Sequence, residues 1–346
     1  MIPKFDETAA AAARAHQAKL TKPTGALGRL ERLVEQLAGI QGVAQPAARP
    51  AACLIFASDH PVTKHGVSAY PSEVTAAMVA NFVGANGRDG GAAASVLCRR
   101  QNVALHVHDV GVQRATEGVP RATCASMAVG DLRVEDAMPR ETFDAAWEAG
   151  RAAVRALDPQ PRVLVLGEMG IGNTTPASAV CAALLGVSAD RVVGRGTGVD
   201  DAGRARKVAV VADAIARVER DAPLEILRRL GGRELVAIAG AAHEAASRRI
   251  AVLVDGFIVS AALLALVRQE PDVAPYLVPA HRSREPGHRA VLEALFEDAL
   301  EPLLDLDLAL GEGSGALAAF PLVELALATH AEMATFESAG VPDREG

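Results

Sequence analysis

Residues 163–180 read Val163-Leu-Val-Leu-Gly-Glu-Met-Gly-Ile-Gly-Asn-Thr-Thr-Pro-Ala-Ser-Ala-Val180. The stretch begins with an apolar run typical of a buried strand, which ends at Gly167, and the carboxylate of Glu168 follows at once. Ligands of open α/β sheets bind in the crevice at the carboxyl ends of the strands. This stretch therefore predicts a parallel sheet and a ligand site at its edge.

The turn after this strand has the composition of an anion site. Gly170 and Gly172 permit positive φ angles or the close approach of a ligand. Polar residues suited to cap a helix follow before Pro176, and these are Asn173, Thr174 and Thr175. The free N–H groups at a helix start attract phosphate. An ordinary capped turn has a similar composition, but the acid between two glycines favours a site.

Short apolar segments alternate with longer helical stretches on both sides of this turn. The expected strands are Ala52–Ala57, Ala104–Val110, Arg162–Leu166, Leu235–Ala239 and Ala251–Val254. Such alternation is typical of a parallel sheet with helices on both faces. The predicted fold class is therefore α/β.

Both ends of the chain have helical spacing of apolar residues. Helices are expected over residues 6–20, with Asp6 or Thr8 as the cap, over 24–40, with Thr24 as cap, and over Leu322–Phe336. Since no strand follows the last helix, we expect it to pack against the first two. The expected division is 1–48 for the N-terminal helices of a small helical domain, 49–304 for a large α/β domain, and 305–346 for the C-terminal part of the small domain.

Composition disfavours several classes of function. The 346 residues are 50% hydrophobic and 3% aromatic, carry a net charge of −7 and contain no basic run. Such a chain can bury a large core, whereas nucleic-acid or anionic-membrane binding is not expected. The apolar stretch Ile250–Val267 is long enough to suggest a membrane span. Asp255-Gly256 in its middle instead favours a short strand followed by a buried helix.

The four cysteines, Cys53, Cys98, Cys124 and Cys181, are far apart and form no CxxC pair. We expect buried free thiols in a reducing compartment. The N-terminus has no apolar signal core, so a cytoplasmic location is expected.

A second glycine loop reads Leu308-Ala-Leu-Gly-Glu-Gly-Ser-Gly-Ala316 and places Glu312 between glycines beside an apolar helix. Desolvation raises the pKa of such a carboxyl, which suits a general base near neutral pH. A solvated turn glutamate is the alternative for this loop alone. Two acids of this kind, Glu168 and Glu312, together indicate a pocket.

A third glycine loop, Gly194-Arg-Gly-Thr-Gly198, precedes a helix expected from about Asp200. Its glycines can admit a phosphate, and Lys207 can reach back toward it. The pattern is weak by itself, because the chain contains neither the dinucleotide fingerprint nor a P-loop.

Polar residues in the loop Phe56–Thr75 and on the strand expected over Ala104–Val110 raise the question of a metal site. The possible ligands are Asp59, His60, His65, His106, His108 and Asp109. Their spacings match no zinc pattern, and His106 and His108 alternate onto one strand face. We therefore expect no metal. Neither Ser58 nor Ser178 lies in a GxSxG turn, so a serine hydrolase has no support.

Taken together, these segments resemble the nicotinate-nucleotide:dimethylbenzimidazole phosphoribosyltransferase family of cobalamin biosynthesis. The likeness runs in order along nearly the whole chain, through Lys22-Pro-Thr-Gly-Ala-Leu-Gly-Arg-Leu-Glu31, Phe56–Thr75, Gly167–Pro176, Gly194–Gly198, Asp255-Gly-Phe-Ile258, His281-Arg-Ser-Arg-Glu-Pro-Gly-His288 and Gly311–Gly315. The resemblance implies a Rossmann-like parallel sheet with helices on both faces, a small helical bundle built from both chain ends, and a homodimer.

The resemblance also implies the reaction and the residues that perform it. Phosphoribose would pass from nicotinate mononucleotide to 5,6-dimethylbenzimidazole, giving α-ribazole 5′-phosphate and nicotinate, without a cofactor or metal. Glu312 would be the general base, and Glu168 a second acid whose role stays open. The nucleotide would be held by Gly170, Gly172, Asn173, Thr174, Thr175, Gly196, Lys207 and Ser283. The acceptor base would lie against Tyr70, Met78 and Leu310.

Several alternatives stay open. Met78 and a longer stretch at Gly84–Gly90 depart from some relatives, so benzimidazoles, other azoles and purines are all candidate acceptors. A conventional phosphoribosyltransferase that uses phosphoribosyl pyrophosphate and magnesium is one rival, although Asp200-Asp201 do not follow a strand as its motif requires. A non-catalytic nucleotide or base sensor is another. Retention of Glu312 disfavours it, since binding alone needs no base catalyst.

Overall fold

A five-stranded parallel sheet forms the centre of the protein. The computed structural model describes residues 1–84, 88–218, 221–296 and 301–342. The strand order is β2-β1-β3-β4-β5. The strands are β1 (Ala51–Ser58), β2 (Ala104–Gly111), β3 (Val163–Met169), β4 (Ala251–Val254) and β5 (Leu277–Pro279). The predicted α/β class and parallel sheet are confirmed.

Helices connect and flank these strands. The α-helices are α1 (Glu7–Gln17), α2 (Arg29–Gln41), α3 (Val74–Val83), α4 (Ala93–Gln101), α5 (Arg140–Arg155), α6 (Thr174–Leu185), α7 (Ala189–Val192), α8 (Asp201–Ile215), α9 (Pro223–Leu230), α10 (Arg233–Ser247), α11 (Phe257–Gln269), α12 (His288–Leu295), α13 (Ser314–Glu332) and α14 (Phe336–Ala339). Short 3₁₀ helices are η1 (Pro61–His65), η2 (Thr123–Ser126) and η3 (Pro271–Tyr276).

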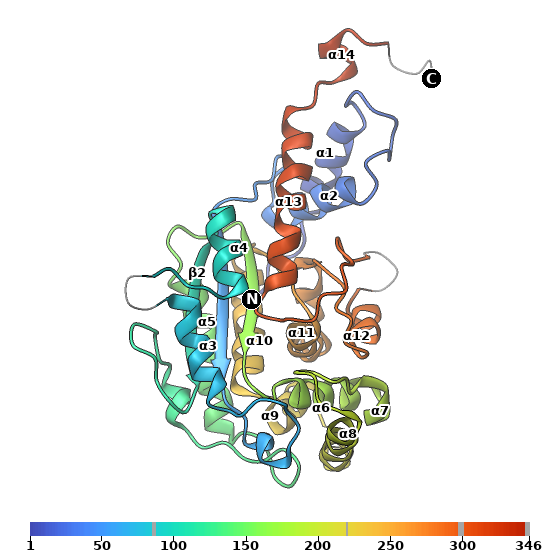
Figure 1. The fold of residues 1–346 in the computed structure, drawn as a ribbon. Coiled ribbons are helices and arrows are strands. Elements are labelled where there is room, and N and C mark those ends of the chain that lie inside the picture. The colour runs from blue at the N-terminus through green and yellow to red at the C-terminus, as the bar shows by residue number, and fades with distance from the viewer. Residues whose placement is uncertain (85–87, 219–220, 297–300, 343–346) are drawn as a thin grey trace.

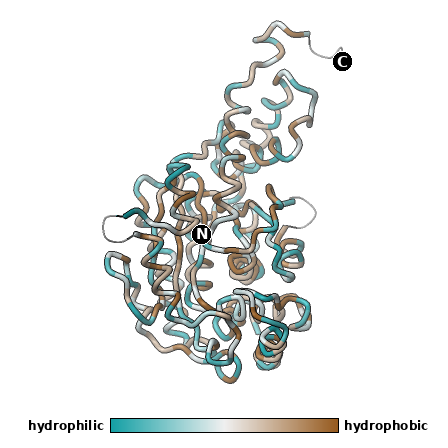
Figure 2. The backbone as a smooth tube through the Cα atoms, viewed as in Figure 1, coloured by the Kyte–Doolittle hydropathy of each residue, from teal (hydrophilic) through white to brown (hydrophobic). Residues whose placement is uncertain are grey.

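Both faces of the sheet are covered (Figure 1). Helices α3 and α4 cross from β1 to β2, with α13 beside α4, and helix α10 lies against β1 to β4 with α5 packed on it. Right-handed crossovers place these two groups on opposite faces, because they lead in opposite directions along the sheet. The apolar segments accordingly concentrate in the strands and in the helix faces around them (Figure 2).

The crossover direction reverses between β1 and β3. The chain leaves β1 toward β2 on one side, and it leaves β3 toward β4 on the other. In this central pair Phe56 is opposite Glu168, and Ala57 is opposite Met169. A reversal of this kind opens a crevice at the carboxyl ends of the strands, where ligands of doubly wound sheets bind. The fold therefore places Glu168 at the expected ligand crevice.

The two chain ends come together in a helical bundle that projects from the sheet in Figure 1. Helix α13 packs against α2, and α1 packs against α2. Gln17 on α1 contacts His330 on α13, with 3.1 Å between Gln17 Nε2 and His330 Nδ1. An isolated bridge between Leu20 and Thr335 joins the same ends. The predicted bundle of N- and C-terminal segments is confirmed.

One predicted strand was wrong, and one observed strand was not predicted. Leu235–Ala239 lies inside α10, whose residues from Arg233 to Ala242 are all buried between the sheet and α5. A helix buried on all sides gives the same apolar run as a buried strand. Strand β5 was not predicted, because it has three residues and ends at Pro279, which lacks an N–H for a ladder.

The helix boundaries differ from the prediction at both ends of the chain. Helix α1 begins after Asp6, whose side chain accepts from Ala9 N at 2.9 Å as expected. Helix α2 begins at Arg29 after Gly28, so Thr24 is not its cap. Helix α13 begins at Ser314, well before the predicted Leu322. It continues through Pro321 because the Leu317 carbonyl that loses its helical partner accepts from Gln101 Nε2 at 3.0 Å.

The four cysteines are buried and free, as predicted. The apolar stretch that begins at Ile250 divides into β4 and α11, also as predicted. Among the described helices, α13 alone is long and apolar enough to cross a membrane, and 56% of that window is buried inside the protein. Helices in the core of a protein can be equally long and apolar, so α13 is only weak evidence for a membrane span.

Candidate active site

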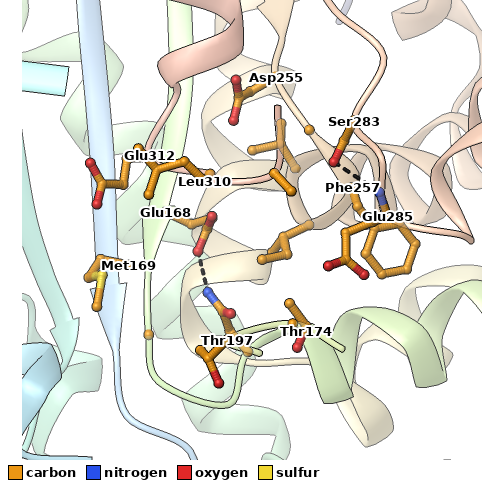
Figure 3. A pocket seen from close by; sticks show the side chains of 18 of the residues that line it. Glu168, Met169, Thr174, Thr197, Asp255, Phe257, Ser283, Glu285, Leu310 and Glu312 are labelled. Atoms are coloured by element: carbon orange, nitrogen blue, oxygen red, sulfur yellow. Dashed lines mark hydrogen bonds between the residues drawn. The ribbon is translucent and has the colours of Figure 1, made fainter. Parts of the chain in front are cut away.

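A cavity of about 470 Å³ lies at the carboxyl edge of the sheet, beside the end of β3. Its walls come from six segments of the sequence, namely Tyr70–Met78, Glu168–Thr174, Gly196–Thr197, Asp255–Val259, His281–Glu285 and Ala309–Glu312. Figure 3 shows Glu168 and Glu312 on one side, with Thr174, Ser283 and Glu285 on the other. The three glycine loops predicted as site elements thus meet at one cavity.

Glu312 lies in a loop that only glycine neighbours permit. Its φ is +62°, between Gly311 at +82° and Gly313 at +75°. A Cβ at Gly311 would approach Glu168 Oε1 to 2.3 Å, so the two acidic loops are in close contact. Burial raises the pKa of Glu312, and nearby Asp255 contributes in the same direction. Its Oε2 is buried and has no hydrogen-bond partner within the described residues. Glu312 therefore presents a free proton acceptor.

Glu168 is the second acid of the cavity and is even less accessible to solvent. It is 4% exposed, and Asn173 Nδ2 donates a hydrogen bond to its Oε2. Burial raises the pKa of Glu168 to about 8, and the negative charges of Asp255, Glu234 and Glu312 add to the effect. At neutral pH the carboxyl group is therefore mostly protonated. The side chain of Asn173 serves this contact and does not cap α6.

Thr174, Gly196 and Lys207 form a corner suited to an anion. Lys207 on α8 is fully buried, and its Nζ donates to Thr174 Oγ1 at 2.6 Å. A Cβ at Gly196 would lie 2.7 Å from Thr174 Oγ1 and 3.1 Å from Lys207 Nζ, so only glycine fits between them and the cavity. Burial lowers the pKa of Lys207 to about 8. Asp200 caps this helix as expected, accepting from Gly203 N at 2.7 Å.

Most predicted site residues line the cavity. They are Tyr70, Met78, Glu168, Gly170, Asn173, Thr174, Gly196, Ser283, Leu310 and Glu312. Gly172, Thr175 and Lys207 do not line it. Gly172 adopts a φ of +89° and packs against Thr63, whereas Thr175 is fully buried in α6. Of the stretch Gly84–Gly90, residues 85–87 lie outside the described part of the chain.

Sequence reasoning missed several wall residues, notably Asp255, Thr197, His281 and Glu285. Asp255 is 1% exposed, and its Oδ1 accepts from Ala316 N at 2.9 Å, which ties β4 to the start of α13. It directly follows β4, so its place after an apolar strand was the signal that could have identified it. Thr197, His281 and Glu285 occupy irregular loops, for which the sequence gives no periodic signal.

The residues considered as metal ligands pair with protein groups. His60 Nε2 lies 2.9 Å from Glu234 Oε1, and His65 Nε2 lies 2.7 Å from Asp131 Oδ2. Asp109 accepts from two backbone N–H groups and pairs with Arg121. Within the described residues, no cluster of three or more His, Cys, Asp or Glu side chains is arranged to hold a metal ion.

The two acids required by the magnesium-dependent rival do not face the cavity. Asp200 accepts the N–H of Gly203 at the start of α8, and Asp201 pairs with Arg195. Neither residue lines the cavity. The placement of these side chains disfavours a conventional phosphoribosyl pyrophosphate site.

Comparison with known proteins gives a consistent result over nearly the full chain. A family model described as phosphoribosyltransferase matches residues 2–341. The nicotinate-nucleotide–dimethylbenzimidazole phosphoribosyltransferase of Bradyrhizobium diazoefficiens is 52% identical over 337 residues, which cover 96% of this chain and 94% of that protein. The enzyme of the same name from Roseiflexus is 47% identical over 345 residues, which cover 98% of this chain and 96% of that protein. The crystal structure of CobT from Thermus thermophilus has a TM-score of 0.90 and 43% identity, covering 97% of this chain and 100% of that one.

Proposed function

Because this chain belongs to the phosphoribosyltransferase family of nicotinate-nucleotide–dimethylbenzimidazole phosphoribosyltransferases, we propose that it transfers 5-phosphoribose from nicotinate mononucleotide to 5,6-dimethylbenzimidazole. The products are α-ribazole 5′-phosphate and nicotinate, and the reaction serves cobalamin assembly. Family membership agrees with the resemblance found in the sequence motifs. The named relatives support the reaction, and the cavity supports its chemistry.

One observation carries the mechanism. Glu312 presents a buried carboxylate oxygen without a hydrogen-bond partner in the described structure, and burial raises the pKa of this group. A base with these properties suits proton transfer near neutral pH. The unprotonated nitrogen of the benzimidazole attacks C1′ as the bond from C1′ to nicotinate breaks, and the other ring nitrogen must then lose its proton. In the proposed mechanism Glu312 accepts that proton.

The remaining chemistry is mainly a matter of positioning. Nicotinate leaves from a positively charged pyridinium, so the leaving group needs no proton, and one base is sufficient. Inversion at the anomeric carbon follows when acceptor and leaving group occupy opposite faces of the ribose. Holding both reactants in line removes much of the entropic barrier. A preformed cavity with loops fixed by close glycine contacts can supply this alignment.

The proposed nucleotide subsite is the corner at Thr174. Thr174, Gly196 and Ser283 face the cavity, and Lys207 supports them from behind through its hydrogen bond to Thr174. A buried cation beside hydroxyl and backbone donors favours phosphate. Gly170, Gly172, Asn173 and Thr175 complete this subsite in the proposal, as the loop and helix start that carry Thr174.

The proposed acceptor subsite lies between α3 and the Glu312 loop. Tyr70, Met78 and Leu310 offer apolar surface there, and Tyr70 and Leu310 are each more than half exposed. A flat aromatic base would cover this surface and place its nitrogen near Glu312. We also propose that the protein is a cytoplasmic homodimer, with 1–48 and 305–346 forming the small helical domain and 49–304 the large one.

The decisive experiment is a product assay with purified protein. We expect nicotinate release from nicotinate mononucleotide only when 5,6-dimethylbenzimidazole is present, with no added metal and in the presence of EDTA. Formation of α-ribazole 5′-phosphate should match nicotinate release one to one. Activity that required phosphoribosyl pyrophosphate and magnesium would refute the proposed reaction. Nucleotide binding without any turnover would instead favour the sensor hypothesis.

A further inference from the structure

Two loops that belong to opposite halves of the cavity are joined by hydroxyl groups. One loop runs from Gly66 to Ser72 after η1 and carries Tyr70, and the other is the turn Gly194–Gly198 between α7 and α8. Thr197 Oγ1 accepts from Ala69 N at 3.0 Å and lies 3.1 Å from Ser68 Oγ. Ser68 Oγ in turn accepts from Tyr70 N at 3.2 Å. The backbone of Tyr70 is therefore held on the glycine turn through two hydroxyls.

The glycine turn is itself fixed to the proposed phosphate corner. Gly196, next to Thr197, packs so closely that its Cβ would meet Thr174 Oγ1 at 2.7 Å. The turn is closed by a hydrogen bond from Gly198 N to Arg195 O at 3.0 Å. Gly196 and Gly198 both have positive φ, which fixes the direction of Thr197 between them. A ligand that contacts Gly196 is thus one residue away from the contact that holds Tyr70.

Thr197 and Tyr70 both line the cavity, and both are exposed at its mouth. Hydrogen bonds at such a place compete with water, so they are the contacts that a neighbouring ligand can strengthen by excluding solvent. A second link to the same loop comes from Arg206 on the neighbouring helix α8, whose hydrogen bonds to Gly66 O are long at 3.4 Å. Of these two links to the Gly66–Ser72 loop, the one through Thr197 is therefore the shorter.

We propose that Thr197 is a positioning residue that couples the two substrate sites. Its hydroxyl holds the Ser68–Tyr70 segment on the glycine turn, so that a nucleotide bound at Gly196 improves binding of the acceptor base beneath Tyr70. This inference rests on the proposed function, because it assigns nucleotide and acceptor to the two halves of the cavity. By linkage, the acceptor improves nucleotide binding by the same factor.

The test is initial-rate kinetics on the full chain with both substrates varied. In the wild-type protein, the KM for 5,6-dimethylbenzimidazole should fall as nicotinate mononucleotide approaches saturation. Thr197→Val keeps the shape of the side chain and removes the hydroxyl. We expect this variant to raise the acceptor KM at saturating nucleotide by about 5- to 30-fold, the effect of losing one or two net hydrogen bonds. The dependence of acceptor KM on nucleotide should disappear, while kcat and the Kd of nucleotide alone stay within about twofold.

Three further variants distinguish coupling from a general structural effect. Thr197→Ser keeps the hydroxyl and should restore the wild-type coupling. Ser68→Ala removes the acceptor for Tyr70 N and should give a smaller increase in acceptor KM. Ser72→Ala is the matched control, because its hydroxyl pairs with Thr63 Oγ1 at 2.9 Å in the same loop but does not line the cavity. Its kinetics should be unchanged.

The outcomes separate this inference from the proposed function. If the wild-type protein transfers phosphoribose and the Thr197→Val variant shows the same coupling as the wild type, the proposed role of Thr197 is overturned. Loss of coupling in Thr197→Ser to the same extent as in Thr197→Val overturns it as well, since the hydroxyl would then be irrelevant. A wild-type protein without transferase activity overturns the proposed function, and the coupling that rests on it.

Discussion

Replacing Glu312 by glutamine tests the proposed base with little disturbance of the fold. The side chain is 5% exposed, and its Oε2 has no hydrogen-bond partner in the described structure. Glutamine has nearly the same size and can occupy the same left-handed backbone conformation between Gly311 and Gly313. The substitution therefore removes mainly the ability to accept a proton. The thermal unfolding midpoint should stay close to that of the wild type.

The expected loss follows from general-base catalysis. A positioned base contributes roughly 10²- to 10⁴-fold to a rate, which corresponds to about 2.7–5.5 kcal/mol of transition-state stabilisation. The pH profile adds a second signature. Burial raises the pKa of Glu312, and the base must be ionised to act, so the wild-type rate should rise with pH through that raised value. Glu312→Gln has no such group, so its residual rate should lack this rising limb.

The assay is nicotinate release at saturating substrates across pH, together with calorimetric titration of nicotinate mononucleotide. Nucleotide binding should survive in Glu312→Gln, because the proposed phosphate corner lies across the cavity. Glu324→Gln is the control, since Glu324 is on α13 and pairs with Arg49 away from the cavity. A Glu312→Gln rate within about threefold of the wild type at every pH would refute the role of Glu312. Water or Glu168 would then be the proton acceptor.

Three other predictions concern the neighbouring groups. Lys207→Ala should mainly raise the KM for nicotinate mononucleotide. Because burial lowers the pKa of Lys207 to about 8, the nucleotide KM of the wild type should also rise above pH 8. A wild-type nucleotide KM that does not change with pH, or a variant in which only the acceptor KM changes, would contradict the assignment of Lys207 to the phosphate. Gly311→Ala should lower the free energy of unfolding, measured in urea, by about 1–3 kcal/mol, because the φ of Gly311 is +82° and the new Cβ would displace Glu168. The control Gly25→Ala should cost less, because Gly25 has a similar φ of +78° but no atom within 4 Å of the new Cβ. Equal losses in the two variants would mean that the contact with Glu168 is unimportant. Burial raises the pKa of Glu168 from its ordinary value of 4.5 to about 8, so the stability that this group contributes is complete below pH 4.5 and is lost as the pH rises through 8. In urea unfolding, Glu168→Gln should therefore be more stable than the wild type by a few kcal/mol at pH 9 but not at pH 4. A stability difference that does not depend on pH would contradict the raised pKa.

The sequence identified the glycine loops that line the cavity better than it predicted the ends of the helices. Glu168, Gly196 and Glu312 each belong to a glycine loop next to an apolar element, and this local pattern does not depend on distant contacts. The Glu168 loop directly follows β3, and loops after parallel strands lie at one edge of the sheet. The pattern therefore places the Glu168 loop at the ligand edge, whereas the Gly196 loop lies between α7 and α8 and the Glu312 loop precedes α13, so the tertiary fold brings these two to the cavity.

The misassigned elements depended on tertiary contacts that the sequence does not display. Leu235–Ala239 was mistaken for a strand because α10, to which it belongs, is enclosed by the sheet and α5. A helix buried in this way lacks the polar face by which an amphipathic helix is recognised in a sequence. Helix α13 continues through Pro321 because the side chain of Gln101, more than two hundred residues earlier, donates a hydrogen bond to Leu317 O. Glu285 was missed for the same reason, since long-range packing places its loop at the cavity, whereas Thr197 lies in a glycine loop that was predicted and only its side chain was not assigned.

The two acids of the cavity illustrate how one environment separates two roles. Glu168 has the acids Asp255, Glu234 and Glu312 as charged neighbours, so burial and repulsion keep it protonated at neutral pH. A protonated carboxyl can donate a hydrogen bond to a ribose or nicotinate oxygen but cannot take the benzimidazole proton. Glu312 has Asp255 as its charged neighbour, and its Oε2 has no hydrogen-bond partner among the described residues. Pairs of titratable groups with separated proton affinities commonly divide acid and base functions in this way. We infer that burial, reinforced by repulsion among these carboxylates, holds the proton on Glu168 and leaves Glu312 as the residue able to act as base.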